Sequence, residues 1–195
     1  MSRRLVLASA SPARQRLLRG AGFDPEVVVS GVDEDVDQPD TRTLVVELAE
    51  RKATAVARRV GDAIVVGCDS MFEIGGTRRG KPRSTDEALA WAESSRGREG
   101  HLHTGHCVID GRSRRRACGV ATTVVRFGHA TDAELAAYVA SGEPLSVAGG
   151  FTLDGRSAPF IDGVDGDPGN VIGLSLPLLR ALLAELDVRI TDLWA

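Results

Sequence analysis

Short apolar runs alternate with amphipathic segments along the chain, and this alternation predicts its secondary structure. Residues 5–8 and 63–68 are almost wholly apolar, which is typical of buried strands, and residues 26–30 predict a further strand. Over residues 12–21 and 43–60 the apolar positions recur at helical spacing, and a glycine directly follows each segment. The first third of the chain is therefore predicted to run strand, helix, strand, helix, strand.

The rest of the chain continues this alternation. Two capping-box patterns, which begin at Ser84 and Thr131, predict helices over residues 85–94 and 132–141. The remaining predicted elements are strands over residues 71–74, 106–109 and 120–127 and an apolar helix over residues 173–186. Because some of these strands are joined by hairpin-like turns, we expect an α/β fold with a mixed central sheet flanked by helices.

Length and composition indicate one soluble globular domain over residues 1–195. The chain has a mass of 20.6 kDa, with 43% apolar and 26% charged residues, which provides a core and excludes a disordered chain. No repeat, low-complexity tract or linker marks a domain boundary. Apolar runs stay far shorter than the roughly 20 residues of a membrane span, so we expect no membrane association.

Cysteine usage and net charge narrow the class of protein further. Cys68, Cys107 and Cys118 are odd in number and include no C-x-x-C pair, which indicates neither a disulfide framework nor a thiolate zinc site. We therefore expect a reduced, cytoplasmic protein. The net charge of −3 and the pI near 5.8 argue against bulk nucleic acid as the main partner.

Two lysines stand out among the basic residues. Of the 24 basic side chains only Lys52 and Lys81 are lysine, and the others are arginine. One interpretation is chance, since surface lysine and arginine often interchange. The other is that both positions need a compact, strongly hydrated point charge. A site that binds phosphate oxygens together with a metal ion is one setting in which such a charge is suitable.

The segment from Ser9 to Arg14 lies between a predicted strand and a predicted helix, where anion-binding loops occur. Ser11 suits the N-cap and Pro12 the first helical position, where a missing N–H costs nothing. The free amides of the first turn, the hydroxyls of Ser9 and Ser11, and Arg14 make a plausible phosphate site. The alternative is an ordinary capped helix with a surface arginine.

Carboxylates follow two of the predicted strands. Asp69 is expected at the carboxyl end of the most apolar strand, the edge at which ligand sites of α/β sheets gather. Asp33 and Glu34 lie in an acidic loop after another strand, and such hard oxygen ligands suit Mg²⁺ or Mn²⁺. The alternatives are that Asp69 merely caps a strand or turn and that the acidic loop is simply solvated.

Other candidate motifs are weaker. The segment from Gly75 to Pro82 matches G-x-x-x-x-G-K but has proline where a P-loop needs Ser or Thr, and no helix follows directly, so we reject a P-loop. His101 and His103 would share one face of a strand, but no convincing further zinc ligand accompanies them. The arginine cluster at 112–116 is interpreted as a solvated hairpin tip, with an RNA contact as the alternative.

Eight motifs then appear in an order that spans nearly the whole chain. They are Ser-Ala-Ser-Pro-Ala-Arg-x-x-Leu-Leu (9–18), Val-Asp-Glu (32–34), Leu-Ala-x-x-Lys-Ala (48–53), Gly-Cys-Asp (67–69), Gly-Lys-Pro (80–82), Tyr-Val-Ala-Ser-Gly-Glu-Pro (138–144), Ala-Gly-Gly-Phe (148–151) and Asn-Val-Ile-Gly-Leu (170–174). In this the sequence resembles the Maf proteins, nucleoside triphosphate pyrophosphatases also called septum-formation inhibitors.

The resemblance implies an architecture like that of the inosine triphosphate pyrophosphatases, with two lobes around a deep cleft. It implies metal-dependent cleavage of nucleoside triphosphates to monophosphate and pyrophosphate, which would clear non-canonical or modified nucleotides. Asp69 resembles the family's proton acceptor, with Glu34 beside it as a metal ligand and Lys81 as a second catalytic residue. The positions that resemble the family's phosphate-binding residues are Ser9, Ser11, Arg14, Lys52 and Lys81.

The sequence departs from the family at positions that resemble its base-selecting residues. Ala13 replaces an Arg or Trp, Ser70 follows Asp69 where Thr or Gln is frequent, and Asp154 stands where Gln or Glu marks subgroups. The chain therefore resembles neither the dTTP/UTP-specific nor the 7-methyl-GTP-specific pattern, and we predict no nucleobase.

Two other functions remain open from the sequence. One is a nucleotide-binding regulator of cell division that acts through a protein partner, although a pure binder has no need of a water-activating carboxylate. The other is a phosphatase that releases single phosphates, but an aspartyl-phosphate enzyme would require Asp-x-Asp where this chain has Cys68-Asp69-Ser70. A homodimer is also left open.

Overall fold

The computed structural model describes residues 3–195, and the chain divides into two compact units. The first unit contains the described residues up to Asp69 together with 104–121 and 173–195, and the second contains 70–103 and 122–172. Strands β3 (Ile64–Ile74), β5 (Glu99–Asp110) and β6 (Arg116–Phe127) contribute residues to both units. The expected α/β class is confirmed, and the two units agree with two lobes, while the cleft stays a prediction.

The sheet is mixed, as the sequence predicts. Within residues 3–195 its strand order is β2-β1-β3-β5-β6-β7, with β4 paired to β3. The first unit holds the parallel pairs, in which β1 (Leu5–Leu7) lies between β2 (Glu26–Val27) and β3. The second unit holds antiparallel pairs of β3 with β4 (Thr77–Arg79) and of β6 with β7 (Ile161–Asp165).

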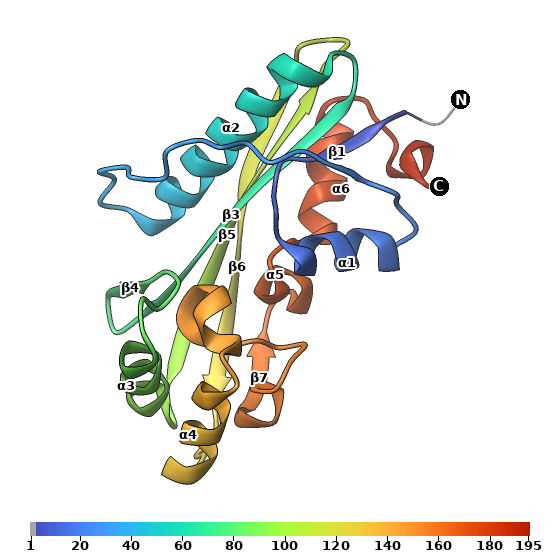
Figure 1. Ribbon diagram of the computed structural model, residues 1–195. Helices are drawn as coiled ribbons and strands as arrows, with labels where there is room; N and C mark the ends of the chain where they lie inside the picture. The colour runs from blue at the N-terminus through green and yellow to red at the C-terminus, as the bar shows by residue number, and fades with distance from the viewer. Residues whose placement is uncertain (1–2) are drawn as a thin grey trace. The chain divides into compact units, whose positions relative to one another are not determined.

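In the first unit, strands are buried on both faces by different helices. Helix α2 (Thr41–Val60) packs on the face that presents Val6 and Val65. The opposite face, with Leu7 and Val66, forms a larger apolar cluster with α1 (Pro12–Gly20) and α6 (Leu176–Glu185) (Figure 1). Because successive residues of a strand point to opposite faces, strands covered on both sides appear as continuous apolar runs.

Two glycines let α2 lie very close to the sheet. A Cβ atom added to Gly67 of β3 would meet Ala53 N at 2.8 Å and Ala53 Cβ at 2.9 Å, and would overlap the carbonyl oxygen of Ala49. A Cβ added to Gly105 of β5 would overlap the backbone of Val45 on the same helix. The close contact between helix and sheet therefore depends on the missing side chains.

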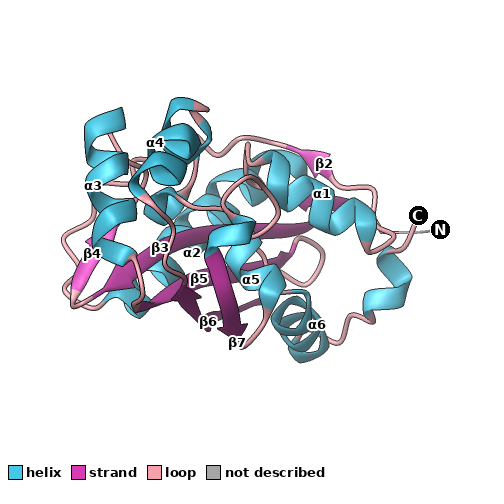
Figure 2. Ribbon diagram, turned by 90° about the horizontal axis from the view of Figure 1, so that it is seen from below, coloured by secondary structure: helices cyan, strands magenta, loops and turns pink. Residues whose placement is uncertain are grey.

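The second unit has its own aromatic core. Phe72 packs edge-on against Phe127 and Phe151, with ring centroids 5.8 and 5.0 Å apart. Helices α3 (Thr85–Ser95) and α4 (Asp132–Ala140) lie side by side in both views of the chain (Figure 2). The predicted N-caps are confirmed, since the hydroxyls of Ser84 and Thr131 accept the backbone N–H groups three residues on.

Two expectations about element boundaries are wrong. Strand β3 does not end at Asp69 but continues to Ile74, so the segments predicted over 63–68 and 71–74 are one strand. The apolar helix predicted over 173–186 is present but begins later, because the backbone breaks at Gly173, which has φ +125°, and Ser175 caps α6 at Leu176. A short helix, α5 (Pro168–Ile172), precedes this break.

No helix within residues 3–195 is long and apolar enough to cross a membrane.

The contact between α2 and β3 can be tested with Gly67→Ala. The added methyl group has no room against Ala49 and Ala53, so we expect the free energy of unfolding to fall by about 2–3 kcal/mol. Gly20→Ala is a matched control, since nothing lies within 4 Å of a Cβ there. Urea denaturation of both variants measures the difference, and equal stabilities would contradict the close contact.

Candidate functional site

The loop between β1 and α1 has the geometry of a capped helix N-terminus. The Ser11 hydroxyl accepts the backbone N–H of Arg14 at 3.4 Å, and Pro12 occupies the first helical position. The Ser9 hydroxyl accepts the Ser11 N–H at 3.2 Å and the Arg14 Nη1 at 3.0 Å. The two serines and the arginine that the sequence predicts as phosphate ligands are thus brought together in the first unit.

Arg14 is held on both sides of its guanidinium. Its Nε donates to the carbonyl oxygen of Gly173 at 2.7 Å, while Nη1 donates to Ser9. The residue is only 9% exposed, so its direction is fixed by these partners rather than by solvent. A fixed cation at the positive end of a helix dipole favours an anionic ligand.

Lys52 of α2 lies between two carboxylates. Its Nζ is 2.5 Å from Asp69 Oδ1 and 2.7 Å from Glu34 Oε1. The Asp69 and Lys52 side chains are 11% and 10% exposed, whereas Glu34 is 62% exposed in its loop. The sequence predicts Lys52 as a phosphate ligand, and the structure adds that it forms an ion pair with each of the two predicted metal ligands.

Burial dominates the electrostatics of Asp69. Desolvation raises the pKa of its carboxyl above the ordinary value of 3.8, and the nearby Lys52 and Arg14 only partly oppose this. Glu34 raises the pKa further through like-charge repulsion. The pair with Lys52 therefore makes the ionised carboxylate tolerable in a buried position.

The donor set fits a divalent ion that also binds phosphate. Oxygens from Asp69 and Glu34 converge on one positively charged atom, the Lys52 Nζ. Among the residues that the structure describes, no group of three or more His, Cys, Asp or Glu side chains could hold a metal ion. Mg²⁺ is commonly bound by one or two carboxylates plus substrate phosphates and water, so two converging carboxylates are sufficient.

The remaining predicted site residues lie at the start of the second unit or within it. Ser70 directly follows Asp69 in β3 and is half-buried, while Lys81 and Asp154 are exposed. Ala13, in contrast, belongs to the first unit, within α1.

The segment that carries Lys81 is braced by the glycines of a family motif. The N–H of Gly149 donates to the carbonyl of Gly80 at 2.8 Å, and Tyr138 Oη donates to the carbonyl of Gly150 at 3.2 Å. Gly149 and Gly150 both have positive φ, and a Cβ on Gly149 would meet Phe72 Cβ at 2.8 Å. The motifs around Tyr138 and Gly149 therefore have a structural role beside Lys81.

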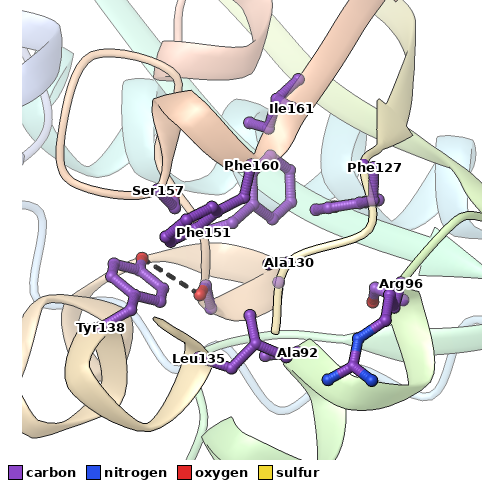
Figure 3. A pocket seen from close by; sticks show the side chains of 14 residues that line it. Ala92, Arg96, Phe127, Ala130, Leu135, Tyr138, Phe151, Ser157, Phe160 and Ile161 are labelled. Atoms are coloured by element: carbon purple, nitrogen blue, oxygen red, sulfur yellow. Dashed lines mark hydrogen bonds between the residues drawn. The ribbon is translucent and has the colours of Figure 1, made fainter. Parts of the chain in front are cut away.

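A cavity in the second unit is lined in part by Gly149 and Gly150 (Figure 3). Phe127, Phe151 and Phe160 line it together with Tyr138, and Arg96 lies at its border. Its walls are mainly apolar, and the predicted catalytic, phosphate-binding and metal-binding residues are not among the described residues that line it. This cavity is therefore distinct from the group around Asp69.

Little in the sequence indicates the role of His106, which holds the segment that contacts Arg14. Its Nε2 accepts the Ser175 N–H at 2.8 Å, and its Nδ1 lies 3.0 Å from the carbonyl of Thr104. A carbonyl only accepts, so Nδ1 carries the proton and the ring is neutral. The one available signal was the Ser-x-Pro start of α6, since Ser175 is its N-cap.

Removal of the ammonium group tests the electrostatics of Asp69. In metal-free Lys52→Met the partner that lowers the Asp69 pKa is lost, so we expect that pKa to rise above the wild-type value. Since a raised folded-state pKa makes stability fall as pH rises above 3.8, this fall should be steeper in the variant. Carboxyl-carbon NMR titration measures the pKa, and an unchanged or lower value would contradict the pairing.

A second prediction concerns His106→Ala. The change leaves the Ser175 N–H and Thr104 carbonyl without their partner and opens a cavity, so the free energy of unfolding should fall by about 2–4 kcal/mol. His101→Ala removes an exposed histidine and should have little effect. Similar denaturation midpoints for the two variants would show that His106 is not a structural link.

Comparison with known proteins places the chain in a family. Residues 4–186 match the family described as Maf-like protein. A nucleoside triphosphate pyrophosphatase of Streptomyces coelicolor is 62% identical, with 99% of this chain and 95% of that protein aligned. Proteins of the same name from Streptomyces avermitilis and Synechococcus elongatus are 60% and 51% identical, over 98% of this chain and 95% and 97% of their own lengths.

The match extends over almost the whole chain and includes both groups of residues described above. Ser9, Arg14, Glu34, Lys52 and Asp69 all fall within the matched range. The chain belongs to the Maf family.

Proposed function

We propose that this protein hydrolyses nucleoside triphosphates to nucleoside monophosphate and pyrophosphate. Membership of the Maf family and the names of its relatives support this reaction. The observation that carries the proposal is the buried Asp69 carboxylate with Lys52 at 2.5 Å and Arg14 within electrostatic range. A carboxylate and two cations in one place serve a reaction in which water attacks a highly charged phosphate.

Asp69 is the proposed proton acceptor. Desolvation raises its pKa, which makes the carboxylate a better base than a solvent-exposed aspartate. Where the carboxylate also binds a metal ion, its main contribution is to orient the attacking water. Lys81, from the second unit, is the second proposed catalytic residue and stabilises negative charge on the departing pyrophosphate.

The proposed phosphate ligands act through fixed positive charge. Arg14 is prealigned by Ser9 and Gly173, and the Ser9 and Ser11 hydroxyls lie at the N-terminus of α1. The Lys52 ammonium has three N–H donors, and two carboxylates among the described residues accept from it. Its remaining donor is available to a phosphate oxygen.

Asp69 and Glu34 are the proposed ligands of Mg²⁺ or Mn²⁺. When bound, such an ion neutralises phosphate charge and lowers the pKa of a coordinated water. Lys52 already holds the two carboxylates close together, so the ligands are prearranged before any ion arrives. We propose Ala13, Ser70 and Asp154 as the residues that select the base, within a single catalytic domain of residues 1–195.

Product analysis with Asp69→Asn tests the reaction. We expect the wild type to convert members of a panel of normal and modified nucleoside triphosphates to monophosphate and pyrophosphate with Mg²⁺ or Mn²⁺. The variant loses the base, so turnover should fall by about 100-fold or more while nucleotide still binds. Asp24→Asn makes the same chemical change at an exposed position and should keep wild-type turnover.

The other outcomes each assign a different function. Diphosphate with orthophosphate would identify a phosphatase that cleaves the terminal bond. Nucleotide binding without any product from the wild type would favour the regulator that acts through a protein partner. Full wild-type turnover after chelation would remove the metal ion from the proposal, and full turnover in Asp69→Asn would remove Asp69.

A further inference from the structure

Two of the three cysteines face each other in the first unit, across the hairpin of β5 and β6. The N–H of Asp110 donates to the carbonyl of Arg115 at 3.0 Å, which fixes the antiparallel register next to the turn. Cys107 lies three residues before Asp110 on β5, and Cys118 lies three residues after Arg115 on β6. This register therefore places the two cysteines opposite each other. The side chains of Cys107 and Cys118 interact by a hydrogen bond, in agreement with that register.

The position within the ladder suits a covalent bridge. Antiparallel partners alternate between hydrogen-bonded and non-hydrogen-bonded pairs. Arg114 and Arg115 both oppose Asp110 in a bulge at the turn, and Cys107 and Cys118 lie three steps beyond the bond from Asp110 N–H to the Arg115 carbonyl. They therefore form a non-hydrogen-bonded pair, whose Cα atoms lie about 4.5 Å apart in antiparallel sheets. Disulfides form across Cα separations of about 4.4–6.8 Å, so little backbone movement is required.

The two thiols differ in access and in reactivity. Cys107 is buried in the apolar cluster under α2, whereas Cys118 packs against that cluster and is partly exposed. The hydrogen bond with Cys107 lowers the pKa of the Cys118 thiol, helped by the Arg116 guanidinium and opposed by burial and Glu50. Since the thiolate is the reactive form, Cys118 is the nucleophile of the pair and Cys107 the resolving thiol.

We propose that Cys107 and Cys118 are a redox-active dithiol that a small peroxide oxidises to a disulfide. The Cys118 thiolate attacks one peroxide oxygen, the O–O bond breaks, and the product is a sulfenic acid and hydroxide, which takes up the thiol proton as water. The Cys107 sulfur then displaces the sulfenic hydroxyl, which leaves with the Cys107 proton as a second water. Two thiols thereby supply the two electrons that reduce one peroxide.

Cys68 is an internal control for this chemistry. It is fully buried on the opposite face of the sheet, in the cluster with α1 and α6, and burial raises its pKa to about 11. Cys68 has neither solvent access for a peroxide nor a second cysteine in its cluster, so it is inert. The proposal does not depend on the proposed nucleotide hydrolysis, so the two can fail independently.

The test is oxidation of the full-length protein with hydrogen peroxide, followed by denaturation, thiol alkylation and mass spectrometry. The wild type should retain one of its three thiols and lose about 2 Da, and peptide mapping should join Cys107 to Cys118. Dithiothreitol should restore both thiols. Cys68→Ser should form the same bridge, whereas Cys107→Ser and Cys118→Ser should each lose it, with circular dichroism as the check on folding.

Three results would overturn the proposal. These are retention of all three thiols at peroxide concentrations that oxidise free cysteine, conversion of Cys118 to sulfinic acid without a bridge, and a disulfide formed only between two molecules. Should Cys107→Ser fail to fold, Cys118→Ser decides the question, because its thiol is the more exposed of the pair.

Discussion

Helix α2 lies directly on the backbones of β3 and β5 because Gly67 and Gly105 carry no side chain that would hold it away. Residues two apart in a strand share a face, so Asp69 points to the side on which α2 packs over Gly67. Lys52 is the neighbour of Ala53, which contacts Gly67. The close packing therefore brings an ammonium group from the helix within 2.5 Å of a buried carboxylate on the strand.

This arrangement explains how a charged group is kept inside an apolar unit. Asp69 follows a run of fully buried residues, and desolvation is the largest influence on its pKa. Lys52 and Arg14 supply positive charge from two different elements, while Glu34 supplies negative charge from an exposed loop. The two cations favour the ionised form of this buried carboxylate, while the nearby carboxylate of Glu34 opposes it.

Much of this organisation could be predicted from the sequence, and the failures have physical causes. The strand–helix alternation and the caps at Ser84 and Thr131 follow from local patterns and are present in the structure. The continuation of β3 beyond Asp69 was missed. The strand is buried on both faces up to Asp69, whereas towards its end only alternate residues are buried, so the apolar pattern changes within one strand. The break at Gly173 was hidden by apolar residues on both sides of it.

The cluster of charged residues in the first unit was predicted better than the hydrogen bonds that hold the segments around it. The residue types at Arg14, Lys52 and Asp69 indicated a phosphate and metal site, and the structure brings these three within electrostatic range. The link of His106 to Ser175 could not be predicted, since it joins residues 69 positions apart through a backbone N–H that any amino acid would supply. Contacts to the backbone leave almost no trace in the sequence.

The hydrogen bond from Arg14 to the carbonyl of Gly173 also has a consequence for the order of events during synthesis. The two residues are 159 positions apart, and α6, which follows Gly173, completes the apolar cluster that covers α1. An emerging chain can pair β1 with β3 early, but its arginine lacks the Gly173 carbonyl until residue 173 has left the ribosome. The loop from Ser9 to Arg14 therefore gains this contact only after Gly173 has been synthesised, so a chain that ends before Gly173 would lack it.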